Sequence, residues 1–160
     1  MNRKLRARLT PTLSVLIGSA MTLAPIIADA PMLPPFGLMM LLAWRLMRPE
    51  YWKIWAAAPF GLFDDLLSGQ PPGSAVLLWS LIFLAIEAVD NRLVWRDYWQ
   101  DWAIAAAAIA VALTGGLVLV LLSGGGGGLS LIVPQLLISI LLYPLAARIA
   151  ARLDRWRLAI

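Results

Sequence analysis

Cysteine and histidine are both absent from this chain of 160 residues, and charged residues make up only 14% of it. Without cysteine there is no disulfide framework, no thiol nucleophile and no cysteine-ligated metal site. Without histidine, a serine–histidine hydrolase and a histidine proton relay are excluded. Any metal would need oxygen ligands, and any acid–base chemistry would fall to a few carboxylates. The composition therefore argues against most classes of membrane enzyme, and we expect no cofactor or metal.

The chain is unusually rich in apolar residues. They make up 61% of the chain, whose mean hydropathy is +0.82. A soluble domain is about half apolar and about a quarter charged. The polar residues are too few to cover a water-soluble globule, so we expect lipid to be the main solvent. In that setting the net charge of +4 does not point to nucleic acid, because the positions of basic residues matter more than their sum.

Six apolar segments, bounded by charges, prolines or glycines, divide the chain. They cover about residues 12–28, 33–47, 52–68, 73–90, 102–122 and 129–147. Each approaches the roughly 20 residues that cross a bilayer, and a spanning segment must be helical because lipid offers no partners for the backbone. The alternating pattern of a membrane barrel is missing. We therefore predict an all-α integral membrane protein, a single domain over residues 1–160 with six transmembrane helices.

The basic residues predict the orientation of this bundle. If the N-terminus is cytoplasmic, the inner regions are residues 1–11, 45–53, 91–101 and 148–160, and these hold all 13 lysines and arginines. The positive-inside rule then supports six spans and two cytoplasmic termini. Aromatic rings that prefer the interface agree with this. The tryptophans expected there are Trp44, Trp52, Trp55, Trp95, Trp99, Trp102 and Trp156.

A secretory signal peptide is the alternative interpretation of the N-terminus. It has a basic start, an apolar run and Ala28-Asp29-Ala30 as a cleavage site. Pro31 directly after that site would obstruct cleavage, and losing the segment would unbalance the charge pattern. We therefore expect the segment to be retained as the first span.

Two adjacent carboxylates, Asp64 and Asp65, stand in an apolar stretch just before the turn SGQPPG at residues 68–73. Gly61, Asp65 and Gly69 follow one another at intervals of four, which places them on one face of a helix. Small residues on such a face allow a second helix to approach closely.

We expect Asp65 to face protein and to accept hydrogen bonds from the backbone of the turn, from Ser68 or from Ser74. An ion- or proton-coupling site stays open as an alternative, because acids inside membranes often mark transport pathways. A polar contact with a partner's span is a third possibility.

Other polar residues have simpler expected roles. Arg45 is expected to snorkel to the lipid headgroups, and Glu87 and Asp90 are expected to pair at the interface with Arg92 and Arg96. Interhelical hydrogen bonds are predicted for the polar residues inside spans, which are Thr114, Gln135 and Ser139.

The stretch NRLVWRDYWQD, residues 91–101, places its aromatic residues at helical spacing. This pattern predicts a short amphipathic segment on the inner leaflet. Interfacial anchoring is the simple interpretation, and the alternative is a docking surface for a cytoplasmic partner, formed by Arg92, Trp95, Arg96 and Trp99. The glycine run at 123–128 lacks the lysine and following Ser or Thr of a phosphate loop, so we expect a flexible connector.

The stretch GLFDDLLSGQPPGSAVLLW, residues 61–79, resembles the signature of the bacterial rod shape-determining protein family MreD. That signature reads Gly-x-x-x-Asp-x-x-Ser-Gly-x-x-x-Gly between two central spans. Here it falls on Gly61, Asp65, Ser68, Gly69 and Gly73. Elsewhere the agreement lies in length and span layout. The extra Asp64 and the glycine run depart from the pattern, so no role is carried over to them.

The resemblance implies a non-enzymatic membrane component of the cell-elongation machinery, which helps to organise lateral peptidoglycan synthesis and cell shape. Its implied partners are MreC first, then the actin-like MreB and the RodA–penicillin-binding protein synthase, with membrane lipids around it and no nucleic acid. We expect the seam of Gly61, Asp65 and Gly69 to shape the surface that binds MreC.

The family also resembles the six-helix substrate-binding subunits of ECF vitamin transporters, although a shared fold does not establish transport. The alternative function is therefore a small-molecule carrier of the ECF type, in which Asp65, Trp79 and Gln135 line one cavity. A structural subunit of some other complex is the third hypothesis.

Overall fold

The computed structural model describes residues 3–23, 33–92 and 97–158, and within these ranges the chain is entirely helical or irregular. The α-helices are α1 (Arg3–Ala20), α2 (Phe36–Met47), α3 (Ala57–Ser68), α4 (Ser74–Asp90), α5 (Tyr98–Leu122) and α6 (Leu129–Leu158). A 3-10 turn at Met21–Leu23 continues α1, and another at Ile54–Ala56 leads into α3. The prediction of an all-α fold is confirmed for the described residues.

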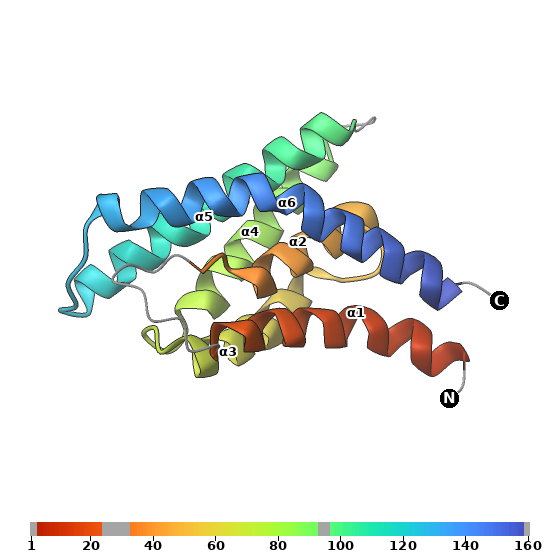
Figure 1. Ribbon diagram of the computed structural model, residues 1–160, viewed down its shortest axis with the longest axis horizontal. Coiled ribbons are helices and arrows are strands. Elements are labelled where there is room, and N and C mark those ends of the chain that lie inside the picture. Colours follow the sequence, from red (N-terminus) through yellow and green to blue (C-terminus); the bar gives the residue numbers. More distant parts are fainter. Residues whose placement is uncertain (1–2, 24–32, 93–96, 159–160) are drawn as a thin grey trace.

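The helix ends gather at two opposite ends of the molecule (Figure 1). One end holds the beginning of α1, the end of α6, the connection between α2 and α3, the end of α4 and the beginning of α5. We call it the basic end, because Arg45 and Arg48 lie at the end of α2 and Arg92 follows α4. The opposite end holds the α3–α4 turn and the glycine-rich connection between α5 and α6. Two such ends suit the predicted topology, in which six spans cross a membrane.

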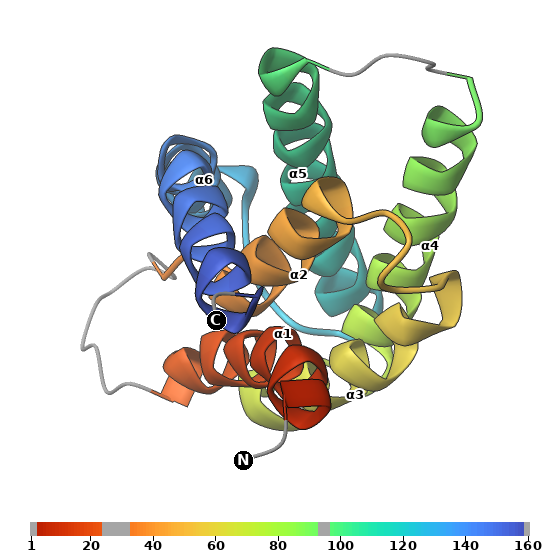
Figure 2. The ribbon, with the colours of Figure 1, turned by 90° about the vertical axis from the view of Figure 1, so that its right-hand side faces the viewer.

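Helix α2 lies in the middle of the bundle when the molecule is viewed end-on (Figure 2). Ten of its 12 residues are buried, as expected for a helix that is apolar on every side. At about 1.5 Å per residue this helix is about 18 Å long, well short of a hydrocarbon core of about 30 Å. Helix α3 also has 12 residues. The predicted second and third spans are therefore shorter helices than the apolar pattern suggests.

Helices α5 and α6 are the two described helices that are long and apolar enough to cross a membrane. Only 22% of the most apolar stretch of each is buried. The core helix of a soluble protein would hide such a surface from water. Exposed leucines continue over the other helices, among them Leu66 of α3 at 76% and Leu81 of α4 at 50% exposure. This distribution fits a helical protein whose surroundings are lipid.

Two of the tryptophans expected at the membrane interface, Trp44 and Trp52, lie instead in the protein core. The ring of Trp52 packs at 4.9 Å from that of Phe60, between centroids. Trp55 and Trp156 are exposed, as interfacial anchors would be. Hydropathy alone does not separate these cases, because an aromatic ring near the end of a helix can face a neighbouring helix as well as lipid.

Candidate functional site

The carboxylate of Asp65 holds the beginning of α4. Its side chain is buried at the end of α3, with 6% exposure. It accepts hydrogen bonds from the backbone amides of Gly73 at 3.0 Å, Ala75 at 2.8 Å and Val76 at 3.2 Å. The hydroxyl of Ser74 donates a fourth at 3.0 Å. The expected contact between Asp65 and the turn is thus present, and it extends into the first turn of α4.

These contacts explain why an acid stands in so apolar a stretch. The first backbone amides of a helix have no partner within the helix, and the helix dipole makes this end favourable for a negative charge. Asp65 supplies from α3 the cap that α4 lacks among its own side chains. Because all four donors belong to the turn or to α4, the carboxylate anchors one helix on the next.

Glycines make this arrangement sterically feasible. A Cβ atom on Gly61 would lie 2.7 Å from the backbone nitrogen of Val76, so α3 and α4 approach each other too closely for a side chain. Gly69 ends α3 with φ of 66°, and Gly73 precedes α4 with φ of 91°. Both angles lie in the left-handed region, where glycine is favoured.

The seam predicted from the sequence therefore lies inside the protein. Gly61 and Asp65 are buried against α4, and Gly69 and Gly73 shape the turn between the two helices. Ser68 is half-buried, and among the described residues its hydroxyl has no hydrogen-bond partner. A partner protein would meet the outer surface of this α3–α4 hairpin, because its inner surface is already occupied.

Arg45 does not snorkel to the headgroups as the sequence predicted. It is 2% exposed and forms ion pairs with Glu87 and with Asp90, the latter at 3.1 Å. Its guanidinium also lies 5.9 Å from the ring centre of Phe83.

The acids of α4 were expected to pair with Arg92 and Arg96 instead. α2 is central, so Arg45 reaches α4 before it reaches solvent, and a buried guanidinium requires paired carboxylates.

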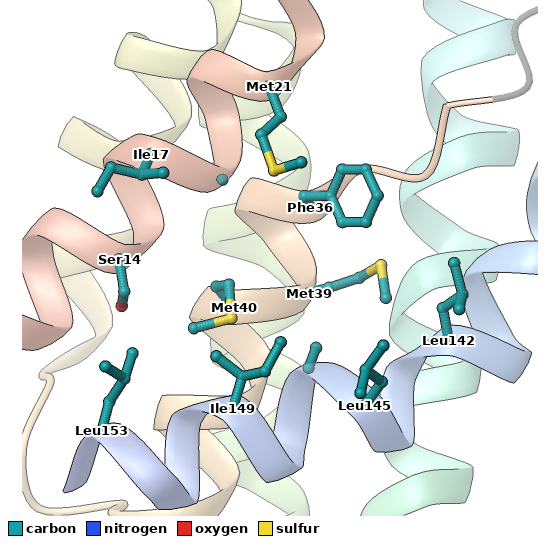
Figure 3. A pocket seen from close by; sticks show the side chains of 12 residues that line it. Ser14, Ile17, Met21, Phe36, Met39, Met40, Leu142, Leu145, Ile149 and Leu153 are labelled. Atoms are coloured by element: carbon teal, nitrogen blue, oxygen red, sulfur yellow. The ribbon is translucent and has the colours of Figure 1, made fainter. Parts of the chain in front are cut away.

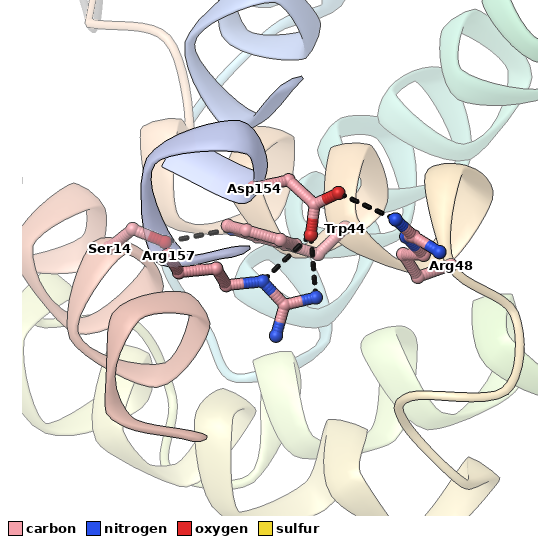
Figure 4. A network of polar contacts seen from close by, with 5 residues as sticks. All are labelled: Ser14, Trp44, Arg48, Asp154 and Arg157. Atoms are coloured by element: carbon pink, nitrogen blue, oxygen red, sulfur yellow. Dashed lines mark hydrogen bonds and ion pairs between the residues drawn. The ribbon is translucent and has the colours of Figure 1, made fainter. Parts of the chain in front are cut away.

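A second polar network joins α1, α2 and α6 at the basic end (Figure 4). Asp154 receives hydrogen bonds from Arg48 at 2.8 Å and from Arg157 at 2.7 Å. Arg157 lies over the ring of Trp44, whose indole nitrogen donates to Ser14 at 2.8 Å. The sequence analysis treated these arginines only as cytoplasmic charges. The available signal was Asp154, a lone acid three residues before Arg157 in a basic segment.

The charge of Asp154 is stabilised by its two arginines. This residue follows the apolar stretch 129–147 of α6, and its side chain is 9% exposed. Burial alone would raise the pKa of Asp154, but the hydrogen bonds from Arg48 and Arg157 outweigh burial and lower it. The carboxylate is therefore ionised at neutral pH, and it ties the end of α6 to the end of α2.

The polar residues inside the predicted spans do not form one site. Gln135 donates to the backbone carbonyl of Leu33 at 2.6 Å, so its partner is the irregular segment before α2 and not the neighbouring helix that was expected. Ser139 and Thr114 donate to carbonyls of their own helices, so the interhelical hydrogen bonds expected from them are absent among the described residues. Trp79 is buried in the core, whereas the carboxylate of Asp65 accepts hydrogen bonds from the α3–α4 turn and the start of α4. These contacts do not support a shared carrier cavity.

The predicted inner-face segment is only partly described. Trp95 and Arg96 lie outside the described residues. Arg92 is exposed after the end of α4, and Trp99 is 71% exposed. Residues 98–101 form the first turn of α5, and the side chain of Asp97 caps this helix. The part of the segment after residue 97 is thus the start of a long helix and not a separate helix along the membrane surface.

Comparison with known proteins finds one family. The family model for the rod shape-determining protein MreD matches residues 2–145, which includes both the Asp65 cap and the buried Arg45 cluster. No curated protein and no solved structure matches the chain. The match covers most of the sequence, and four residues of the pattern at 61–73 build the α3–α4 cap and turn described above, namely Gly61, Asp65, Gly69 and Gly73. The chain belongs to the MreD family of membrane proteins that determine rod shape.

Proposed function

We propose that this protein is a multi-pass component of the bacterial inner membrane that holds MreC within the cell-elongation complex. Through MreC it would connect MreB and the RodA–penicillin-binding protein synthase to lateral peptidoglycan synthesis. Family membership gives the role in rod shape determination. The observation that carries the finer proposal is the Asp65 cap, which fixes the α3–α4 hairpin as a rigid unit. The family is not known as an enzyme family, and the proposal needs no catalytic step.

The outer surface of the α3–α4 hairpin suits a lateral partner. Leu62 and Leu66 lie one turn apart on α3 and are 53% and 76% exposed. Leu77 and Leu81 on α4 are 49% and 50% exposed. Helices associate in membranes by close packing of such surfaces, and a rigid surface loses less entropy on binding. The seam at Gly61 and Asp65 would then act indirectly, because it fixes the position of the surface that MreC contacts.

The basic end suits a second, cytoplasmic contact. Arg92 and Trp99 are exposed there. The sequence predicts a docking surface for a cytoplasmic partner from Arg92, Trp95, Arg96 and Trp99, and we infer that this partner belongs to the MreB-linked machinery. Arginine and tryptophan side chains are enriched at protein interfaces, so these exposed residues suit contact with an acidic protein surface. Arg92→Glu combined with Trp99→Ala should therefore weaken co-purification of MreB while that of MreC is retained.

Depletion in a rod-shaped host tests the proposed function. We expect depleted cells to become round, and we expect the wild-type protein to restore rods. Leu66→Trp should insert normally, lose co-purification with MreC and leave the cells round, because the larger side chain changes the hairpin surface. Val118→Trp on α5 is the matched control, since Val118 is 52% exposed on another helix. Depleted cells that keep their rod shape would refute the proposed function. Full MreC binding by Leu66→Trp would refute the hairpin surface.

A further inference from the structure

A groove of about 330 Å³ opens between α1, α2 and α6 (Figure 3). Met39 and Met40 of α2 form its floor, with Ile17 of α1 on one side and Leu145 and Ile149 of α6 on the other. Ser14 contributes the one side-chain hydroxyl, and it already accepts the indole proton of Trp44. The lining is apolar and built largely from flexible side chains, which adapt to an occupant of irregular shape.

Three arginines lie beside the groove on α6. Arg148, Arg152 and Arg155 follow one another at helical spacing and are exposed. With Leu145, Ile149 and Leu153 they line a second hollow of about 520 Å³ along α6. The same three apolar residues line the groove, so the two hollows adjoin each other along α6. The apolar groove thus lies beside a row of positive charges.

These arginines differ from Arg45, Arg48 and Arg157, which are paired with acids. Arg45 is paired with Glu87 and Asp90, and Asp154 binds Arg48 and Arg157. None of Arg148, Arg152 and Arg155 forms an ion pair with any residue that the structure describes. The nearby acid of α6, Asp154, is therefore already bound, and the row of arginines has no anionic partner among residues 3–23, 33–92 and 97–158.

We propose that this groove binds one anionic phospholipid. One acyl chain lies between α1 and α6, and the phosphate contacts Arg148, Arg152 and Arg155. The volumes of both hollows fall within the range of about 300–1,000 Å³ that is typical of ligand sites. Basic pockets of membrane proteins on the cytoplasmic side recruit anionic headgroups, and guanidinium groups match phosphate oxygens closely. The apolar helix of a partner protein would fill the groove but leave the arginines without an anion, so a phospholipid fits both parts.

Lipid retention by the purified protein tests this site. Native mass spectrometry in detergent should show that the wild type retains one phosphatidylglycerol in preference to phosphatidylcholine. Each arginine near the membrane surface contributes about 1 kcal/mol, so Arg152→Gln should reduce this preference about fivefold. The triple change R148Q/R152Q/R155Q should abolish it. Lys53→Gln is the matched control, because Lys53 is exposed at the same end and lines neither hollow.

The apolar half of the site needs its own variant. Ile149→Trp should fill the groove and release the bound lipid, whereas Leu141→Trp, on an exposed face of α6 outside the groove, should leave it bound. Unchanged helical circular dichroism and a single gel-filtration peak establish that each variant is folded. Equal retention of both lipids by the wild type, or an unchanged preference in the triple variant, would overturn the proposal.

A photo-crosslinker at Ile149 in intact membranes distinguishes lipid from protein as the occupant. A mass increase of one phospholipid supports the proposal, and a protein adduct overturns it. This readout is independent of MreC: cells that stay rod-shaped on depletion would refute the proposed function while leaving the lipid site intact.

Discussion

The side-chain carboxylate of Asp65 on α3 accepts the backbone amide proton of Ala75 on α4 at 2.8 Å, although ten residues separate them in the chain. This contact joins the two helices next to the turn between α3 and α4. It also gives a physical reason for the acid and the glycines in the sequence pattern at residues 61–73. An acid placed eight residues before a glycine can cap the next helix when the turn between them is tight.

Asp65→Asn should destabilise the protein by about 1–3 kcal/mol, because the amide group would direct a donor at backbone N–H groups and leave at least one of them unsatisfied. Asp65→Ala should be worse, since no acceptor remains. Thermal inactivation in detergent, followed by gel filtration, measures both. Asp64→Asn is the control, because Asp64 makes no hydrogen bond to α4 among the described residues. Equal stability of Asp65→Asn and the wild type would show that the cap is dispensable.

Gly61→Ala should destabilise the α3–α4 hairpin by about 1–3 kcal/mol, the usual cost of overpacking a tight contact. The new methyl group would meet the backbone of α4 at Ala75 and Val76, which cannot move aside as a flexible side chain would. Gly126→Ala is the matched control, because a Cβ atom there meets open space. The same thermal assay compares the two variants. A Gly61→Ala protein as stable as Gly126→Ala would contradict the close approach.

Arg45→Gln should destabilise the protein more than Glu87→Gln, because the arginine is buried and its removal leaves two acids of α4 facing the bundle. Breaking a fully buried ion pair costs about 3–5 kcal/mol. Glu87 is 44% exposed, so we expect a loss below that range. A double-mutant cycle measures the coupling between the two side chains. Additive effects would mean that the pair contributes nothing, and Arg92→Gln serves as the exposed control.

Single cysteines can test the topology, because the natural chain contains none. An impermeant maleimide applied to spheroplasts should label Gly126→Cys, between α5 and α6, and should not label Arg92→Cys at the basic end. Both should react after the membrane is permeabilised, which controls for accessibility. Labelling of Arg92→Cys in sealed spheroplasts would reverse the orientation predicted from the basic residues.

Composition and charge pattern were sufficient for the coarse architecture. The scarcity of charge predicts helices in lipid. The grouping of all basic residues in four regions predicts which helix ends lie together, and the helix ends of the structure do gather at two opposite ends of the bundle. The spacing of Gly61, Asp65 and Gly69 predicts one helix face against protein. Such inferences succeed because they depend on local periodicity and on the cost of burying charge.

Which polar side chains meet was decided only by the tertiary structure. Arg45 near a helix end could equally have reached the headgroups, and its pairing with Glu87 follows from the central position of α2. Trp44 likewise packs under Arg157, more than a hundred residues away. The sequence by itself determined the solvent, the helices and the side on which positive charge gathers. The packing of the helices determined which side chains contact one another, because the direction in which a helix face points depends on the other helices around it.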